Sequence, residues 1–242
     1  METEGSGTTS RLADVVQEFA SAVVPALRGG DDRFDLLGSV LTQDDDPLAA
    51  AAVRVLAADA LAPCLLAEKA TSERDVLLFR QAIDGYPPTP DAAVPTVWSH
   101  WGMRAALGRL HVGAPGGETH QHTAPDTAWV AAQPWQRMTH QLAQLASLAL
   151  PGLPSPLATA VAARPVDLAR GFVRAVRRRD WTQAAGAGRW LTVTPGVPSS
   201  LGLPAGLEFV RHMGGADARV ALHVRAAQLA AERTRVPSEA SV

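Results

Sequence analysis

Apolar residues recur at helical spacing along most of this chain. Near the N-terminus, Leu12, Val15 and Phe19 follow Ser10, a residue type that often caps helix N-termini. Strand-forming residues are scarce, and only 190–193 and 218–224 are short strand candidates. The pattern therefore predicts an all-α fold, an irregular multi-helix bundle of about eight to ten helices.

Prolines and glycines divide these helical stretches. The clearest break is 85–95, which contains four prolines and cannot continue a helix. We expect residues 1–9 to be disordered, 10–233 to form a helical domain and 234–242 to be a flexible tail. Two arrangements stay open for the domain: a single unit, or two packed halves, 10–84 and 96–233, on either side of the break.

The helix expected at 96–111 is apolar on two sides. Trp98, Trp101 and Ala105 share one face, whereas Met103 and Leu107 share another with Leu110. A helix with two apolar faces needs neighbours on both of them. The pattern therefore predicts a central position for this helix.

Composition and charge narrow the class of protein. The chain of 242 residues has a formal net charge of -2, without the basic excess of a general nucleic-acid binder, so nucleic acid is an unlikely partner. Lys69 is the only lysine, Ile83 is the only isoleucine, and asparagine is absent. This skew follows GC-rich codons and indicates a high-GC bacterium such as an actinomycete.

Targeting and membrane signals are weak. The polar, acidic first residues lack the basic and apolar regions of a secretory signal. The stretch 49–67 comes nearest to a membrane span, but Arg54, Asp59 and Pro63 interrupt it. The lone cysteine, Cys64, excludes an intramolecular disulfide. We therefore expect a soluble, cytoplasmic protein without a membrane segment.

Histidine is concentrated in one region of the chain. Five of the 7 histidines lie between positions 100 and 140, in a helix, the Gly/Pro-rich loop after it and the next helical stretch. His120 and His122 could share one divalent transition metal if the loop is extended, because alternate residues of extended backbone face the same side. The candidate site comprises His100, Arg104, His111, Glu118, His120, His122, Asp126 and His140. The alternative explanation is a solvated polar loop that happens to hold histidines.

Two further sets of residues could form a binding surface. Four tryptophans flank the histidines and could line a pocket or pack in the core: Trp98, Trp101, Trp129 and Trp135. Four arginines follow one face of the helix expected at 165–179, where they could bind an acidic partner or simply be solvated: Arg170, Arg174, Arg177 and Arg178.

Recognised catalytic motifs are missing from the sequence. It has no Walker A motif, no Gly-x-Gly-x-x-Gly and no Gly-x-Ser-x-Gly. The leading hypothesis is therefore a non-catalytic helical protein that binds a partner protein, a peptide or a small molecule. The alternative is an enzyme of specialised metabolism, metal-dependent or not, with its site in the histidine-rich region 100–140.

Overall fold

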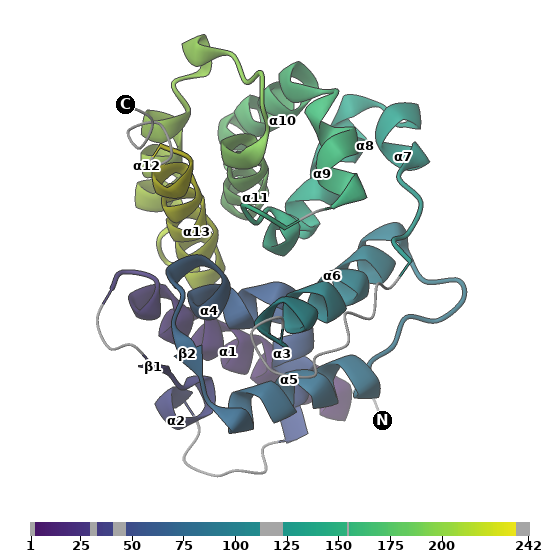
Figure 1. The fold of residues 1–242 in the computed structure, drawn as a ribbon, viewed down its shortest axis with the longest axis vertical. Coiled ribbons are helices and arrows are strands. Elements are labelled where there is room, and N and C mark those ends of the chain that lie inside the picture. The colour runs from purple at the N-terminus through teal and green to yellow at the C-terminus, as the bar shows by residue number, and fades with distance from the viewer. Residues whose placement is uncertain (1–2, 30–32, 41–46, 112–122, 154, 236–242) are drawn as a thin grey trace.

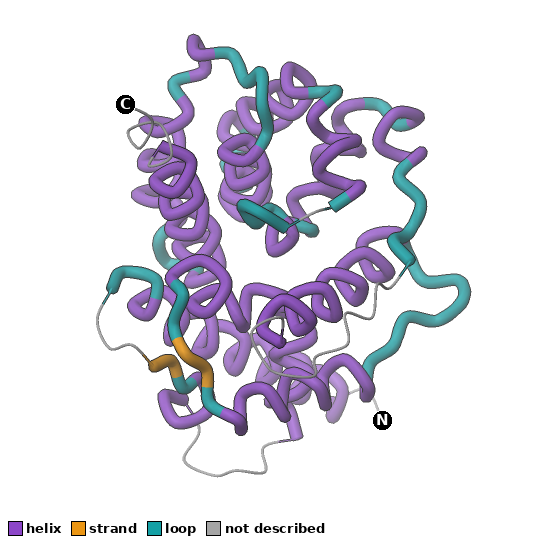
Figure 2. Tube along the Cα trace, viewed as in Figure 1, coloured by secondary structure: helices purple, strands orange, loops and turns teal. Residues whose placement is uncertain are grey.

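A computed structural model describes residues 3–29, 33–40, 47–111, 123–153 and 155–235. Most of these residues are helical, with two short strands (Figure 2), and the predicted all-α class is confirmed. The first helices are α1 (Thr3–Ala26), α2 (Leu36–Val40), α3 (Pro47–Leu56), the 3-10 turn η1 (Ala57–Leu61), α4 (Ala62–Ala67), α5 (Glu73–Gly85) and α6 (Val94–His111). The strands are β1 (Arg33–Phe34) and β2 (Ala70–Thr71).

The second part of the chain continues the bundle. It comprises α7 (Ala128–Ala132), α8 (Trp135–Gln144), η2 (Ala146–Leu148), α9 (Pro156–Ala162), α10 (Pro165–Arg177), α11 (Trp181–Val193), η3 (Ser199–Leu201), α12 (Leu203–Gly214) and α13 (Ala218–Arg235). The described helices are more numerous than expected, because prolines and short turns divide some helical stretches. Pro134, for example, separates α7 from α8.

The sequence placed several boundaries incorrectly. Helix α1 begins at Thr3 rather than Ser10. Between α1 and α3 lie β1 and the short α2, where backbone N–H groups of Leu36 and Leu37 donate to the Asp75 carboxylate at 2.7 and 3.0 Å. Because Asp75 lies in α5, this cap is invisible in the local sequence. The strand candidates 190–193 and 218–224 lie in α11 and α13, since short apolar runs also suit buried helices.

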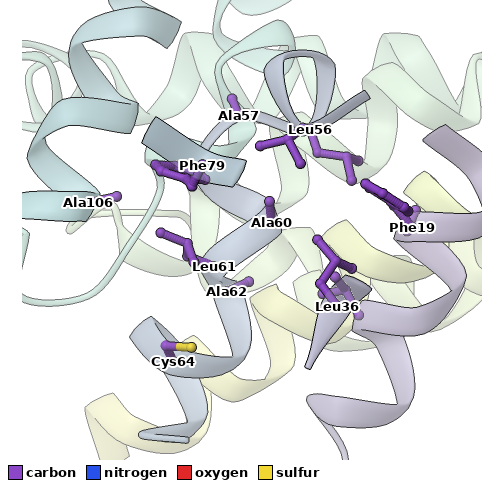
Figure 3. Packing of buried hydrophobic residues seen from close by; sticks show 14 of the residues in the cluster. Phe19, Leu36, Leu56, Ala57, Ala60, Leu61, Ala62, Cys64, Phe79 and Ala106 are labelled. Atoms are coloured by element: carbon purple, nitrogen blue, oxygen red, sulfur yellow. The ribbon is translucent and has the colours of Figure 1, made fainter. Parts of the chain in front are cut away.

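The helices enclose two hydrophobic cores. The first is built mainly from α1 to α5, and Figure 3 shows Phe19, Leu61 and Phe79 within it. The second is built mainly from α8 to α12, around Trp98 and Trp190. In Figure 1 these groups occupy the lower and upper parts of the molecule.

Helices α6 and α13 contribute to both cores. Trp98 of α6 belongs to the second core, whereas Met103 and Ala106 belong to the first. This confirms the two-faced, central helix that the sequence predicts. On α13, Leu222 packs into the first core and Val224 into the second.

One apolar stretch, Leu48–Ala67, would be long enough to cross a membrane by length and composition alone. It comprises most of α3, all of η1 and α4, and most of its residues are buried in the first core. Such burial is typical of a core helix in a soluble protein.

Helices α8 and α11 approach closely at Gly186. A Cβ atom at this position would lie 2.6 Å from the carbonyl oxygen of Ala143, a backbone atom that cannot swing aside. Gly186→Ala is therefore expected to lower the free energy of unfolding by about 2 kcal/mol. Urea titration followed by circular dichroism measures this change.

Gly108→Ala is the matched control for this substitution. Gly108 is an exposed glycine within α6, and a Cβ atom there meets nothing within 4 Å. Alanine at this helical position should raise stability by about 0.5 kcal/mol. Equal effects of the two substitutions would contradict the close α8–α11 contact.

Candidate functional site

The arginine face of α10 borders a groove on the protein surface. The helix buries Leu168, Phe172 and Ala175 in the second core, which leaves the opposite face to solvent. Arg170, Arg174, Arg177 and Arg178 are all exposed on this face, as the spacing of the sequence predicts.

Three segments of the chain build the groove. Its volume is about 720 Å³, and its lining joins α10 to Trp135 of α8 and to the segment around η3. The lining residues are Trp135, Val166, Ala169, Arg170, Val173, Arg174, Arg177, Arg178, Pro198, Ser200 and Leu201. The floor is thus mainly apolar, and four arginines supply every charge in the lining.

The one acidic residue of α10, Asp167, leaves most of this charge unneutralised. Asp167 binds Arg164 at 2.7 Å and Arg170 at 3.2 Å. The Arg174 guanidinium lies over the Trp135 ring, 5.9 Å from its centroid. Within the described part of the chain, no carboxylate pairs with Arg174, Arg177 or Arg178. The groove therefore presents positive charge beside apolar surface.

The described members of the histidine-rich set have separate partners. His100 Nε2 lies 3.2 Å from the Ile83 carbonyl oxygen on α5, and burial lowers the pKa of this imidazole. His140 lies on the exposed side of α8, where Nδ1 is 3.1 Å from Gln183 Oε1. The Asp126 carboxylate accepts a hydrogen bond from the Ala128 backbone, and Arg104 is exposed.

The metal prediction depends on the other members. Glu118, His120 and His122 lie outside the described residues, as does the side chain of His111. Among the residues that are described, no group of three or more His, Cys, Asp or Glu could hold a metal ion. A metal held by His120 and His122 stays a prediction.

The four tryptophans do not line one pocket. Trp98 and Trp129 are buried in the second core, and Trp101 packs edge-on against Trp98 with the ring centroids 5.2 Å apart. Trp135 alone of the four lines the groove. The structure therefore brings Trp135 together with the arginine face, two predictions that the sequence did not connect.

Sequence reasoning missed a buried polar cluster between the two cores. Arg189 of α11 donates to Asp59 Oδ1 at 2.6 Å, and its Nε–H donates to the Ala149 carbonyl at 3.4 Å. His223 Nδ1 of α13 lies 3.3 Å from Asp59 Oδ2. All three side chains are buried. They come from positions 59, 189 and 223, so no local pattern could have linked them.

Charge states follow from these contacts. Burial alone would raise the pKa of Asp59, but the Arg189 charge and the hydrogen bond from His223 outweigh it and lower this pKa to about 2. Burial lowers the pKa of His223, so the ring is neutral at pH 7. His223 Nδ1 lies 3.3 Å from Asp59 Oδ2 and 3.4 Å from Arg189 Nη1, so the tautomer of the ring sets whether Nδ1 donates to the carboxylate or accepts from the guanidinium. The cluster is an ion pair with a neutral imidazole.

No protein-family model, curated protein or solved structure matches this chain. We therefore infer function from the geometry of the groove itself.

Proposed function

We propose that this protein is a non-catalytic binding protein of the bacterial cytoplasm, and that the α10 groove holds an acidic, amphipathic segment of a partner protein. One observation carries the proposal: three arginines without carboxylate partners, among the described residues, lie beside an apolar floor.

The chemistry of the groove selects this class of partner. Arginine binds carboxylates through a planar fork of N–H donors. Among the described residues, no carboxylate occupies these donors on Arg174, Arg177 or Arg178. Val166 is 49% exposed although it is apolar, which offers a contact for an apolar side chain. A peptide with carboxylates on one side and apolar residues on the other satisfies both features.

The open shape of the groove and its single aromatic residue disfavour two other classes of partner. The groove is open, so a small anion would remain largely solvated in it, whereas a peptide can follow its length. A single-stranded nucleic acid usually stacks on several aromatic rings, and Trp135 is the only aromatic residue in this lining.

A designed peptide tests the proposal directly. The probe is a fluorescein-labelled amphipathic helix of about 15 residues, with leucine on one face and glutamate on the other. Its control replaces every glutamate with lysine. Fluorescence anisotropy at low salt should show binding of the glutamate peptide with a Kd on the order of 10 µM, and no binding of the lysine peptide.

The salt dependence of the affinity then distinguishes binding through charges from binding through apolar contacts alone. Raising the ionic strength from about 0.05 M to about 0.5 M shortens the Debye length to about 4 Å. The affinity for the glutamate peptide should fall about tenfold over this range. Binding that does not respond to salt, or equal binding of the lysine peptide, would rule the proposal out.

A further inference from the structure

A second hollow lies beside the buried polar cluster, and none of its lining residues lines the groove. It is a recess of about 30 Å³ whose lining includes Asp59, Ser99, Ser147, Arg219 and His223. This volume holds one or two water-sized groups. Helices α6 and α13, together with η1 and η2, therefore meet around a small polar space between the two cores.

The recess adjoins a larger, more open pocket. The outer pocket has a volume of about 670 Å³ and shares Val55, Ser99 and Gln144 with the recess. Its wall includes the apolar or largely apolar residues Tyr86, Pro87 and Pro95. A ligand with a compact polar head and an apolar body would fit the two spaces together.

Charge determines which polar head the recess would hold. Both carboxylate oxygens of Asp59 already have partners, because Arg189 binds Oδ1 and His223 binds Oδ2. The Arg219 guanidinium, by contrast, has no hydrogen-bond or ion-pair partner among the described residues. Asp217, two positions earlier, accepts from the Arg219 backbone N–H rather than from its guanidinium. The Arg219 charge acts on the Asp217 carboxylate and lowers its pKa against the opposing effect of burial, and Arg54 adds a further positive charge beside Ser99. The three arginines and two carboxylates around the recess therefore leave one net positive charge.

Free donors are also present around the recess. Ser147 is buried, and no described group bonds its hydroxyl. The Ser99 hydroxyl accepts from Arg54 Nη1 at 3.0 Å, so its own proton can be donated. Buried donors without acceptors are costly, and an anion would satisfy them.

We infer that the recess binds the carboxylate of a small organic acid, with Arg219 as its ionic partner and the apolar body of the acid in the outer pocket. Arg219 and a carboxylate form a charge-assisted contact, and the Ser99 and Ser147 hydroxyls supply further donors. A carboxylate has three heavy atoms and suits the small recess, whereas the five atoms of phosphate exceed it. This site is independent of the groove and of its peptide.

Isothermal titration calorimetry with phenylacetate tests the inference. Phenylacetate should bind with a Kd on the order of 1 mM, as expected for ten non-hydrogen atoms. Its uncharged analogue phenylacetamide and inorganic phosphate should each bind at least tenfold more weakly. Arg219→Gln should weaken phenylacetate binding by at least tenfold, and Ser147→Ala by about threefold.

The matched control is Arg137→Gln, an exposed arginine on α8 outside both hollows. It should leave the affinity for phenylacetate unchanged. Thermal unfolding of each variant checks that it is folded. If Arg219→Gln does not fold, Ser147→Ala keeps the inference testable. The carboxylate site would be overturned if phenylacetate did not bind detectably, or if its amide bound equally well. Tighter binding of phosphate, or an unchanged affinity for phenylacetate in both variants, would also overturn it.

Discussion

Replacing Arg189 with methionine is expected to lower the free energy of unfolding by about 4 kcal/mol. The side chain is completely buried, and it is the cation that pairs with the ionised Asp59. Methionine fills much of the same space but leaves a buried carboxylate with only the neutral His223 beside it. An uncompensated charge in the interior costs several kcal/mol.

Urea unfolding followed by circular dichroism measures this loss. Arg178→Met is the matched control, because Arg178 is exposed and has no described carboxylate partner. It should change stability by less than about 0.5 kcal/mol. A cost below about 1 kcal/mol for Arg189→Met would show that no ionised pair holds the two cores together at this point.

A double substitution distinguishes a lost ion pair from lost packing. Asp59→Leu combined with Arg189→Met removes both charges, so it should recover most of the stability that Arg189→Met loses. If the double variant were less stable than Arg189→Met alone, packing rather than charge would explain the effect. The comparison remains informative if the single variant does not fold.

The sequence was a good guide where structure depends on neighbouring positions. Helical periodicity predicted the all-α class, and the spacing of Trp98, Met103 and Leu107 predicted the two-faced α6. The arginine face of α10 also followed from periodicity, because residues four positions apart share a helix face.

Contacts between distant positions were invisible in the sequence. Asp59 was noted only as an interruption of an apolar stretch, and nothing in the sequence around Arg189 or His223 marked either residue as buried. The cap that Asp75 provides to α2 was missed for the same reason. Charged residues become buried partners only when the fold brings their elements together, and the helical pattern does not encode that pairing.

The groove combined both kinds of information. Its arginines could be predicted as one helix face, but the contribution of Trp135 and of the residues around η3 required the tertiary structure. An arginine row alone is usually a solvated face. The apolar floor beside it distinguishes this row as a binding surface.

Reversing two charges in the groove should abolish binding of the glutamate peptide. In the variant Arg174→Glu/Arg177→Glu, two attractive contacts become repulsive, and each reversal costs more than the roughly 1 kcal/mol of one exposed pair. The affinity should therefore fall about a hundredfold. Both side chains are exposed, so the fold should tolerate the change.

Arg11→Glu/Arg137→Glu is the matched control, because it makes the same change in net charge at exposed arginines outside the groove. The decisive measurement is the anisotropy titration of the glutamate peptide against these two variants and the unmodified protein. A hundredfold loss confined to Arg174→Glu/Arg177→Glu is the result that an acidic-peptide groove predicts. Equal losses in both variants would show attraction by overall charge alone, and no loss in either would place the peptide elsewhere; both results would contradict the proposed function.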